Sequence, residues 1–156
     1  MTALDLPSLE ASLRSRWVTI TRRLDATPAR VYRAWADPEE LAGWFPITVE
    51  GSLAVGARTI LTWHDRRIPI EVTDAEPAQT FRFRWPWLAD ESYVTDVTVR
   101  LAPQGYGTQL TLTDGPFDLT LPGVLDAYAE ALEGWGEALA GLRAQVDFSV
   151  DIRPGI

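Results

Sequence analysis

The chain has 156 residues, a formal net charge of −8 and no cysteine. Its hydrophobic content of 46% excludes a disordered chain and is typical of one folded domain. The negative charge disfavours nucleic acid as a partner because phosphate groups would be repelled, and the absence of cysteine excludes disulfides and thiolate chemistry.

The N-terminal residues 1–16 hold Leu4, Leu6, Leu9 and Leu13 but no apolar run of signal-peptide length. We expect them to form an extension with a short helix after Pro7. No segment of the chain is apolar over enough residues to span a membrane, so we expect a cytoplasmic protein without a membrane partner. Residues 17–146 are then predicted to form the domain and residues 147–156 a C-terminal tail.

A strand and two short helices are predicted next. Side chains alternate between apolar and polar from Trp17 to Leu24, which is the pattern of a half-buried strand. Thr27 followed by Pro28 predicts the start of a helix that buries Val31 and Trp35. The pair Asp37-Pro38 ends that helix and predicts a second one, which extends through Leu41.

The middle of the chain predicts an antiparallel meander with one apolar face. Two-residue turns at 65–66, 77–78 and 104–105 would place large apolar residues opposite one another on the same face. The expected pairs are Trp63–Ile68, Leu61–Ile70 and Thr59–Val72, then Val72–Phe83, Ile70–Trp85 and Ile68–Trp87, and finally Val99–Leu110, Val97–Leu112 and Thr95–Asp114. The other face carries charged and polar residues and is expected to be solvated.

A long helix is predicted over residues 122–146, with Pro122 in its first turn and Thr120 or Leu121 as the cap. Its apolar stripe, at spacings of three and four, consists of Leu125, Tyr128, Leu132, Trp135, Leu139, Leu142 and Val146. We expect this stripe to cover the apolar face of the sheet. The glycines within the helix indicate a close approach to the sheet, a bend that opens a cavity, or tight packing without a cavity.

Short motifs are distributed over residues 17–146. They are Ile20–Leu24, Asp25–Pro28, Val31–Leu41, Trp44–Pro46, Leu53–Gly56, Gly107–Thr113 and Glu133–Trp135. In this order they resemble the activator of heat-shock protein 90 ATPase family, within the START-like (SRPBCC) superfamily. The resemblance implies an α+β protein of bacterial type with the helix-grip, or Bet v 1-like, fold. In that fold a curved antiparallel sheet wraps around a long C-terminal helix, and two short helices follow the first strand.

The sequence shows no motif of a metal-dependent or nucleophilic enzyme. His64 is the single histidine and lies beside a predicted turn, where we expect it to be exposed. No cluster has metal-ligand spacing, and neither a phosphate-binding loop nor a nucleophile elbow is present. We therefore predict no catalytic residue, no metal and no cofactor.

Asp114 is the single carboxylate expected on the apolar face of the sheet. A buried carboxylate needs hydrogen bonds, and Thr95, Tyr128 or Arg22 are the candidate donors. Asp114 would either cap a strand end, orient a ligand or act as a general base. We expect the residues around a ligand to be Trp35, Trp63, Phe83, Trp85, Trp87, Tyr93, Thr95, Val97, Leu112, Asp114, Tyr128, Leu132 and Trp135.

These patterns favour a non-catalytic domain that binds a small hydrophobic or aromatic molecule in a cavity between the long helix and the sheet. One alternative is a co-chaperone-like module that binds a protein partner or forms a homodimer. Another is a cofactor-independent enzyme that resembles cyclases and aromatases. An open cavity would favour the ligand-binding and enzyme hypotheses, whereas a filled core with an acidic face would favour the interaction module.

Overall fold

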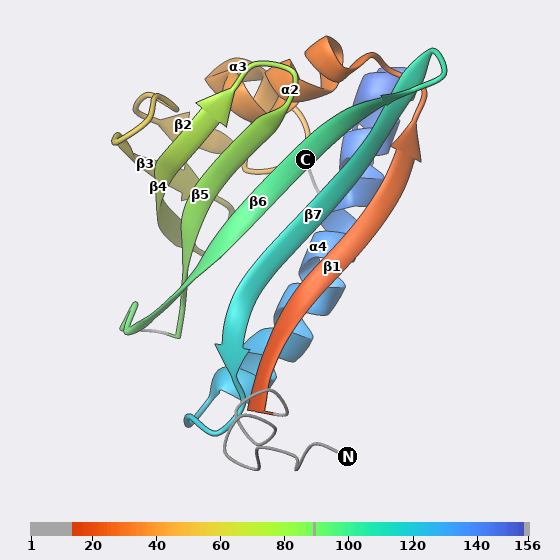
Figure 1. Ribbon diagram of the computed structural model, residues 1–156. Helices are drawn as coiled ribbons and strands as arrows, with labels where there is room; N and C mark the ends of the chain where they lie inside the picture. Colours follow the sequence, from red (N-terminus) through yellow and green to blue (C-terminus); the bar gives the residue numbers. More distant parts are fainter. Residues whose placement is uncertain (1–13, 89, 155–156) are drawn as a thin grey trace, which may run out of the picture.

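A computed structural model describes residues 14–88 and 90–154 of the chain. The leucines of the predicted N-terminal helix therefore lie outside the described residues. The strands are β1 (Ser15–Leu24), β2 (Thr48–Glu50), β3 (Arg58–Thr62), β4 (Arg67–Glu76), β5 (Thr80–Trp87), β6 (Tyr93–Gln104) and β7 (Gly107–Asp118). The helices are α2 (Pro28–Ala36), α3 (Pro38–Leu41) and α4 (Val124–Phe148) (Figure 1).

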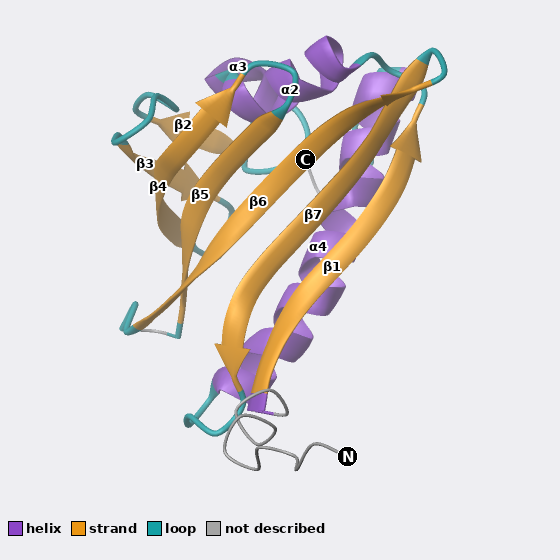
Figure 2. Cartoon of the chain, viewed as in Figure 1, coloured by secondary structure: helices purple, strands orange, loops and turns teal. Residues whose placement is uncertain are grey.

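The strands form one antiparallel sheet in the order β1-β7-β6-β5-β4-β3-β2. The sheet curves, α4 lies along its inner side, and α2 and α3 lie near one end of it (Figure 2). The predicted helix-grip architecture, with two short helices after the first strand, is thus confirmed. Within the described residues, no helix is both long and apolar enough to cross a membrane.

Both short helices begin as their sequences predict. The Thr27 side chain accepts a hydrogen bond from the backbone nitrogen of Arg30, and Pro28 occupies the first turn of α2. One oxygen of Asp37 accepts from the backbone nitrogens of Glu39 and Glu40 at the start of α3. These caps satisfy amide groups that a helix leaves unpaired at its N-terminus.

Two of the three predicted hairpin registers are wrong by two residues. Leu61 faces Ile68 instead of Ile70 because the β3–β4 loop spans residues 63–66, and its ends are joined by a hydrogen bond from Trp63 N to Arg66 O. Likewise, Val99 faces Leu112 because the β6–β7 turn is centred on residues 105–106. Side chains alternate along a strand, so a shift of two residues leaves each of them on its predicted face.

The third register is confirmed where Val72 faces Phe83, and it then shifts by one residue between Val72 and Asp74. In the opposite direction, the β4–β5 pairing ends at Glu71 and Arg84. Pro69 and Pro86 follow on the two strands, and neither can donate a backbone hydrogen bond. The two prolines explain why the sheet opens between β4 and β5 at this point.

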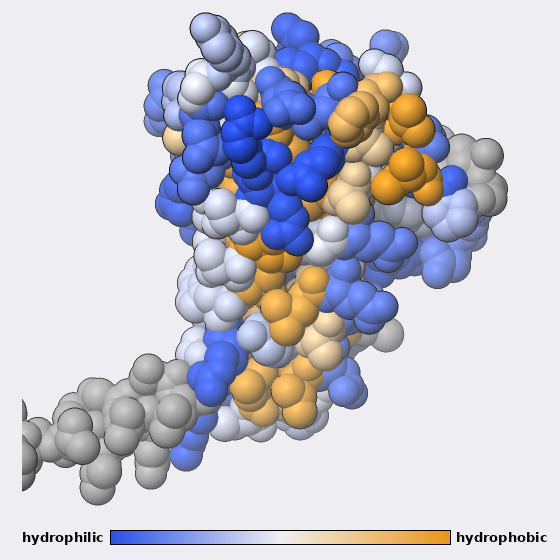
Figure 3. All heavy atoms as spheres, turned by 90° about the vertical axis from the view of Figure 1, so that its right-hand side faces the viewer, coloured by the Kyte–Doolittle hydropathy of each residue, from blue (hydrophilic) through white to orange (hydrophobic). Residues whose placement is uncertain are grey.

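The predicted apolar stripe of the long helix is wrong over its first half. Leu125 and Leu132 are 58% and 43% exposed, whereas Ala127 and Ala131 are buried. Large rings on the sheet occupy the space beneath α4, so that only small side chains fit there. Figure 3, which views the side where β1 and α4 lie, shows a band of apolar atoms among polar ones.

Both ends of α4 differ from the prediction. The helix begins at Val124 after Gly123, whose φ of 80° favours glycine, so neither Thr120 nor Leu121 is the cap. Thr120 instead donates two hydrogen bonds to Asp118, one from its backbone nitrogen and one from its hydroxyl. At the other end, α4 continues to Phe148 and therefore includes the first two residues of the predicted tail.

Residues that were predicted as a tail, both inside α4 and after it, also contact the rest of the domain. Asp147 accepts hydrogen bonds from the backbone nitrogens of Asp25 and Ala26, which follow β1. Further along, the Arg153 guanidinium donates to the carbonyl of Pro46 at 2.7 Å. Residues predicted as a tail therefore hold the loop after β1 and the segment before β2.

Candidate ligand-binding site

Aromatic rings from four parts of the chain meet between α4 and the sheet. Phe83, Trp85 and Trp87 alternate along β5 and so share its inner face. The Trp85 ring lies 5.2 Å from that of Trp135 on α4. Phe45, from the loop before β2, lies 5.0 Å from Trp63, 5.5 Å from Trp135 and 6.0 Å from Trp85.

These rings fill most of the space in which the sequence predicts a cavity. Trp85 and Trp135 are 4% and 3% exposed, so most of this cluster is a packed core. What remains open is a recess of about 50 Å³ at the surface. It is lined by Phe45, Arg66, Trp85, Trp87, Glu130, Ala131, Gly134 and Trp135.

An ion pair connects the two sides of this recess. Arg66, in the loop between β3 and β4, donates to Oε1 of Glu130 on α4 at 3.2 Å. The same guanidinium lies 5.2 Å from the centre of the Trp63 ring, which is cation–π geometry. Both charged side chains are about half exposed, and such pairs contribute only about 0–1 kcal/mol. The ion pair at the border of the recess is therefore inexpensive to break.

A buried polar chain lies among the rings. The Thr95 hydroxyl donates to Oδ1 of Asp114 at 2.5 Å, and Nε1 of Trp135 donates to Oδ2 at 2.9 Å. Nε1 of Trp87 in turn donates to the Thr95 hydroxyl at 2.8 Å. Thr95 was predicted as a donor, but Tyr128 and Arg22 were not confirmed. Arg22 donates instead to the backbone carbonyl of Thr21.

Burial raises the pKa of Asp114 from 3.8 to about 6. The hydrogen bonds from Thr95 and Trp135 oppose this rise, and the negative charge of Asp96 adds to it. In the neutral form, a protonated Oδ1 can donate to Thr95, whose oxygen also accepts from Trp87. Both protonation states of Asp114 therefore have hydrogen-bond partners within the same group of side chains.

The glycines of α4 do not share one structural reason. A Cβ atom at Gly141 would lie 3.4 Å from the carbonyl oxygen of Trp44, so this glycine does approach a neighbour closely. At Gly134 and Gly136 a Cβ atom would meet no atom of the described residues within 4 Å beyond the neighbouring backbone of α4, which argues against close packing as their cause. Gly134 lines the recess, and a larger side chain there would extend into its mouth.

The other predicted site residues lie at different depths. Trp35 extends the cluster through Phe83, at 6.2 Å, and its indole nitrogen is buried without a partner among the described residues. Val97 and Leu112 are buried in the sheet beside the polar chain. Of the predicted residues, only Trp85, Trp87 and Trp135 line the recess itself. The last three of those outside it are Tyr93, Tyr128 and Leu132.

Each of these three has a different environment. The hydroxyl of Tyr93 donates to the carbonyl of Pro116 and accepts from the backbone nitrogen of Asp118. The ring of Tyr128 packs against Phe117 at 5.6 Å. Leu132 is exposed over somewhat less than half of its surface.

Five residues of the recess were missing from the sequence prediction: Phe45, Arg66, Glu130, Ala131 and Gly134. Ala131 precedes Trp135 by four residues and so shares its helix face, a signal that could have been used. Phe45 belongs to a motif in the sequence that suggested no site. His64, as predicted, is exposed, and the described residues contain no group of three His, Asp or Glu side chains arranged to hold a metal.

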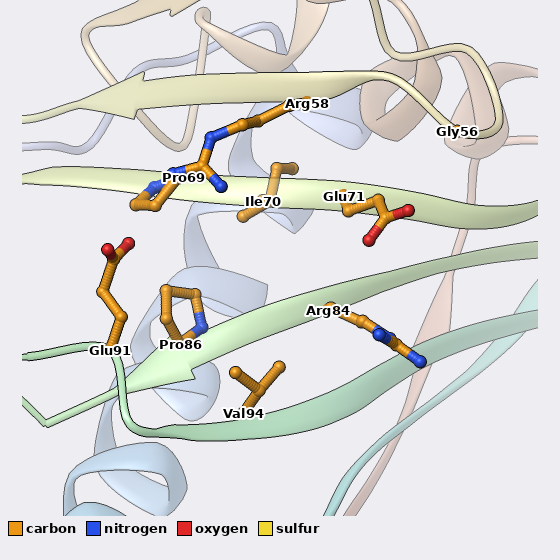
Figure 4. Close-up of a pocket in the computed structure, with 9 residues that line it drawn as sticks. All are labelled: Gly56, Arg58, Pro69, Ile70, Glu71, Arg84, Pro86, Glu91 and Val94. Atoms are coloured by element: carbon orange, nitrogen blue, oxygen red, sulfur yellow. The ribbon is translucent and has the colours of Figure 1, made fainter.

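A larger hollow of about 370 Å³ lies on the outer face of the sheet, where the β4–β5 pairing ends. Arg58 and Glu91 lie toward one end of it and Glu71 and Arg84 toward the other (Figure 4). Its charges are mixed and no aromatic ring lines it. Despite its size, it has fewer features of a ligand site than the aromatic recess, which adjoins a buried polar group.

Solved structures with the same fold have low sequence identity to this chain. Protein MLL2253 from Mesorhizobium loti is 24% identical over 86% of this chain and 99% of its own, with a TM-score of 0.76. Aha1 from Colwellia psychrerythraea, solved as a dimer, is 18% identical over 85% and 97%, with a TM-score of 0.75. CalU16 from Micromonospora echinospora is 24% identical over 90% and 78%, with a TM-score of 0.70.

A comparison with curated proteins gives no significant match. The family model described as activator of Hsp90 ATPase homolog 1-like protein matches residues 25–147, which is most of the chain and includes the β-sheet from β2 onward and nearly all of α4. The protein therefore belongs to the Activator of Hsp90 ATPase homolog 1-like family.

Proposed function

We propose that this protein binds a small aromatic or apolar molecule between α4 and the sheet, and that the molecule enters through the aromatic recess. The observation that carries the proposal is the surface recess at the edge of the buried ring cluster, which Trp85, Trp87 and Trp135 line together with Arg66 and Glu130. Aromatic surfaces of this kind bind apolar rings well because they remove a large area from water.

The recess must enlarge before it can hold such a molecule. Its volume of about 50 Å³ is far below the roughly 300–1,000 Å³ of ordinary ligand sites. Release of Arg66 from Glu130 and Trp63 would uncover the rings at little cost, because both interactions are partly solvated. In this proposal the ligand takes the place of part of the ring packing beside the recess, so those rings move apart when it binds.

The polar chain behind the rings holds in place two of the indoles that the ligand would contact. Nε1 of Trp87 and Nε1 of Trp135 both belong to residues that line the recess, and both hydrogen bonds lead to Asp114. Within the described residues, the hydrogen bonds to Asp114 come from an indole and a hydroxyl and not from a second titratable group. General acid–base chemistry usually needs such a partner, so the arrangement favours binding over catalysis.

Gly134 allows a direct test of the site. Leucine at this position would project into the recess without a clash at its Cβ atom, so the variant should fold. Titration of the wild type with the neutral fluorophore N-phenyl-1-naphthylamine should give saturable enhancement. Gly134→Leu should weaken that binding at least about tenfold, or about 1.4 kcal/mol.

Gly136→Leu is the matched control, because its Cβ atom also meets nothing within 4 Å but the residue does not line the recess. It should bind the fluorophore as the wild type does. Equal loss in both variants, or no saturable binding by the wild type, would remove the basis for this function.

A second candidate function is association through the outer side of α4. Leu125 and Leu132 are exposed there, and the Aha1 structure with the same fold is a dimer. A homodimer or a protein partner would cover these leucines. Sedimentation of the wild type and of Leu132→Glu tests the homodimer: a dimer that dissociates in the variant supports it, and a monomer in both rejects it.

A further inference from the structure

The mouth of the recess contains a cation-binding arrangement that the protein fills with its own side chain. The Arg66 guanidinium lies over the Trp63 ring, 5.2 Å from its centre, and 3.2 Å from the carboxylate of Glu130. An aromatic face and a carboxylate both attract positive charge. Arg66 reaches this position from the β3–β4 loop, whose residues His64 and Asp65 are exposed.

We infer that the preferred ligand is a small organic cation with an aromatic or apolar body, whose charged group displaces Arg66 and lies between Trp63 and Glu130. This inference rests on the proposed function and names the ligand class for the same site. The body of the ligand would lie deeper, against Trp85 and Trp135, whose rings lie 5.2 Å apart.

Three physical features favour a cation over a neutral or anionic molecule. Displacement of Arg66 leaves Glu130 without its partner, so a new positive charge restores an interaction that a neutral ligand cannot. A quaternary ammonium group is also attracted by the face of a tryptophan. The net charge of −8 attracts cations and repels anions at long range.

Three probes of similar size separate these alternatives: phenyltrimethylammonium, its neutral isostere tert-butylbenzene, and the anion benzenesulfonate. Binding is measured from tryptophan emission during titration. The wild type should bind the cation at least about tenfold more tightly than the neutral isostere, a preference typical of a partly desolvated cation–π site. The anion should bind most weakly.

Two pairs of variants show which side chains cause the preference for the cation over its neutral isostere. Glu130→Gln should reduce it to less than about threefold, whereas Glu133→Gln, an exposed position on the same helix with the same change in net charge, should retain it. Arg66→Gln removes the competing cation and should strengthen binding of phenyltrimethylammonium several-fold. Arg67→Gln is the control for charge, because Arg67 pairs with Glu50 away from the recess.

The outcomes separate this inference from the proposed function. Equal binding of the cation and the neutral isostere would overturn the inference and leave the aromatic site in place. Tightest binding of benzenesulfonate would also overturn it, since Arg66 would then be the ligand's partner. Absence of saturable binding for all three probes would overturn the proposed function and the inference together.

Discussion

Nε1 of Trp135 lies 2.9 Å from Oδ2 of Asp114, and this hydrogen bond joins the middle of α4 to the inner face of β7. Asp114 is the single charged residue among the fully buried side chains of the described chain. A buried carboxylate is costly even when hydrogen-bonded, so this contact contributes specificity of position more than net stability. It also places a titratable group directly behind a ring that lines the recess.

Asp114→Asn should change how stability depends on pH. Because the folded-state pKa is raised to about 6, the folded wild type takes up a proton between about pH 6 and 4 that the unfolded chain does not bind. Wild-type stability should therefore rise relative to the variant by about 2 kcal/mol between pH 7.5 and pH 4.5. Urea unfolding of both proteins at the two pH values measures the difference. A constant difference would show that Asp114 does not titrate in this window.

Trp135→Ala should lower the free energy of unfolding by about 3–5 kcal/mol, because it removes a buried ring and leaves Asp114 without one of its two donors. Leu132→Ala, three residues earlier in the same helix, should cost less than about 1 kcal/mol because Leu132 is 43% exposed. Denaturant titration of the two variants tests the helix face. Similar losses would instead support the stripe expected from the sequence, in which both residues are buried.

Gly134→Ala should raise the free energy of unfolding by about 0.5–1 kcal/mol, since a helical glycine costs conformational entropy and nothing lies within 4 Å of the new Cβ atom. Gly107→Ala should do the opposite, because its Cβ atom would lie 2.2 Å from the carbonyl oxygen of Leu24. Thermal melts of both variants compare the two sites. Destabilisation by Gly134→Ala would mean that the helix is more crowded at the recess than the structure shows.

Asp147→Ala should destabilise the fold by about 1–3 kcal/mol, because the backbone nitrogens of Asp25 and Ala26 lose their acceptor. Glu133→Ala, at an exposed position of the same helix, should stay within about 0.5 kcal/mol of the wild type. Chemical denaturation of both variants makes the comparison. Equal stability of the two variants would mean that the hydrogen bonds of Asp147 add nothing measurable to the stability of the fold, as expected for a tail.

The sequence predicted which residues face inward better than it predicted their exact partners. Leu61, Phe83, Val99 and Leu112 all lie on the inner face as expected, although two hairpins are shifted by two residues. Alternation along a strand depends only on whether a residue number is odd or even, so an even error in turn length does not affect the face. The lengths of the loops at 63–66 and 105–106 depend on turn conformation, which composition alone left ambiguous.

The candidate site was predicted less completely, for two reasons. The stripe on α4 was predicted from the spacing of its large apolar residues, but the rings of Trp85 and Trp87 occupy the facing space and leave room for Ala131 and not for Leu132. The rim of the recess depends on Arg66 meeting Glu130 across 64 positions of sequence, a contact that local periodicity cannot indicate. Asp114 and Thr95, in contrast, were identified because a polar residue on an apolar face is rare enough to be noticed.

The most direct test of ligand binding in the recess follows the indole N–H signals of the seven tryptophans in a ¹H–¹⁵N correlation spectrum during titration with naphthalene. The signals of Trp87 and Trp135 should shift saturably together, because both residues line the recess and both N–H groups belong to the chain that ends at Asp114. Trp17, which is half exposed on β1, should not respond. Shifts confined to Trp17, or none at saturating naphthalene, would contradict binding between α4 and the sheet.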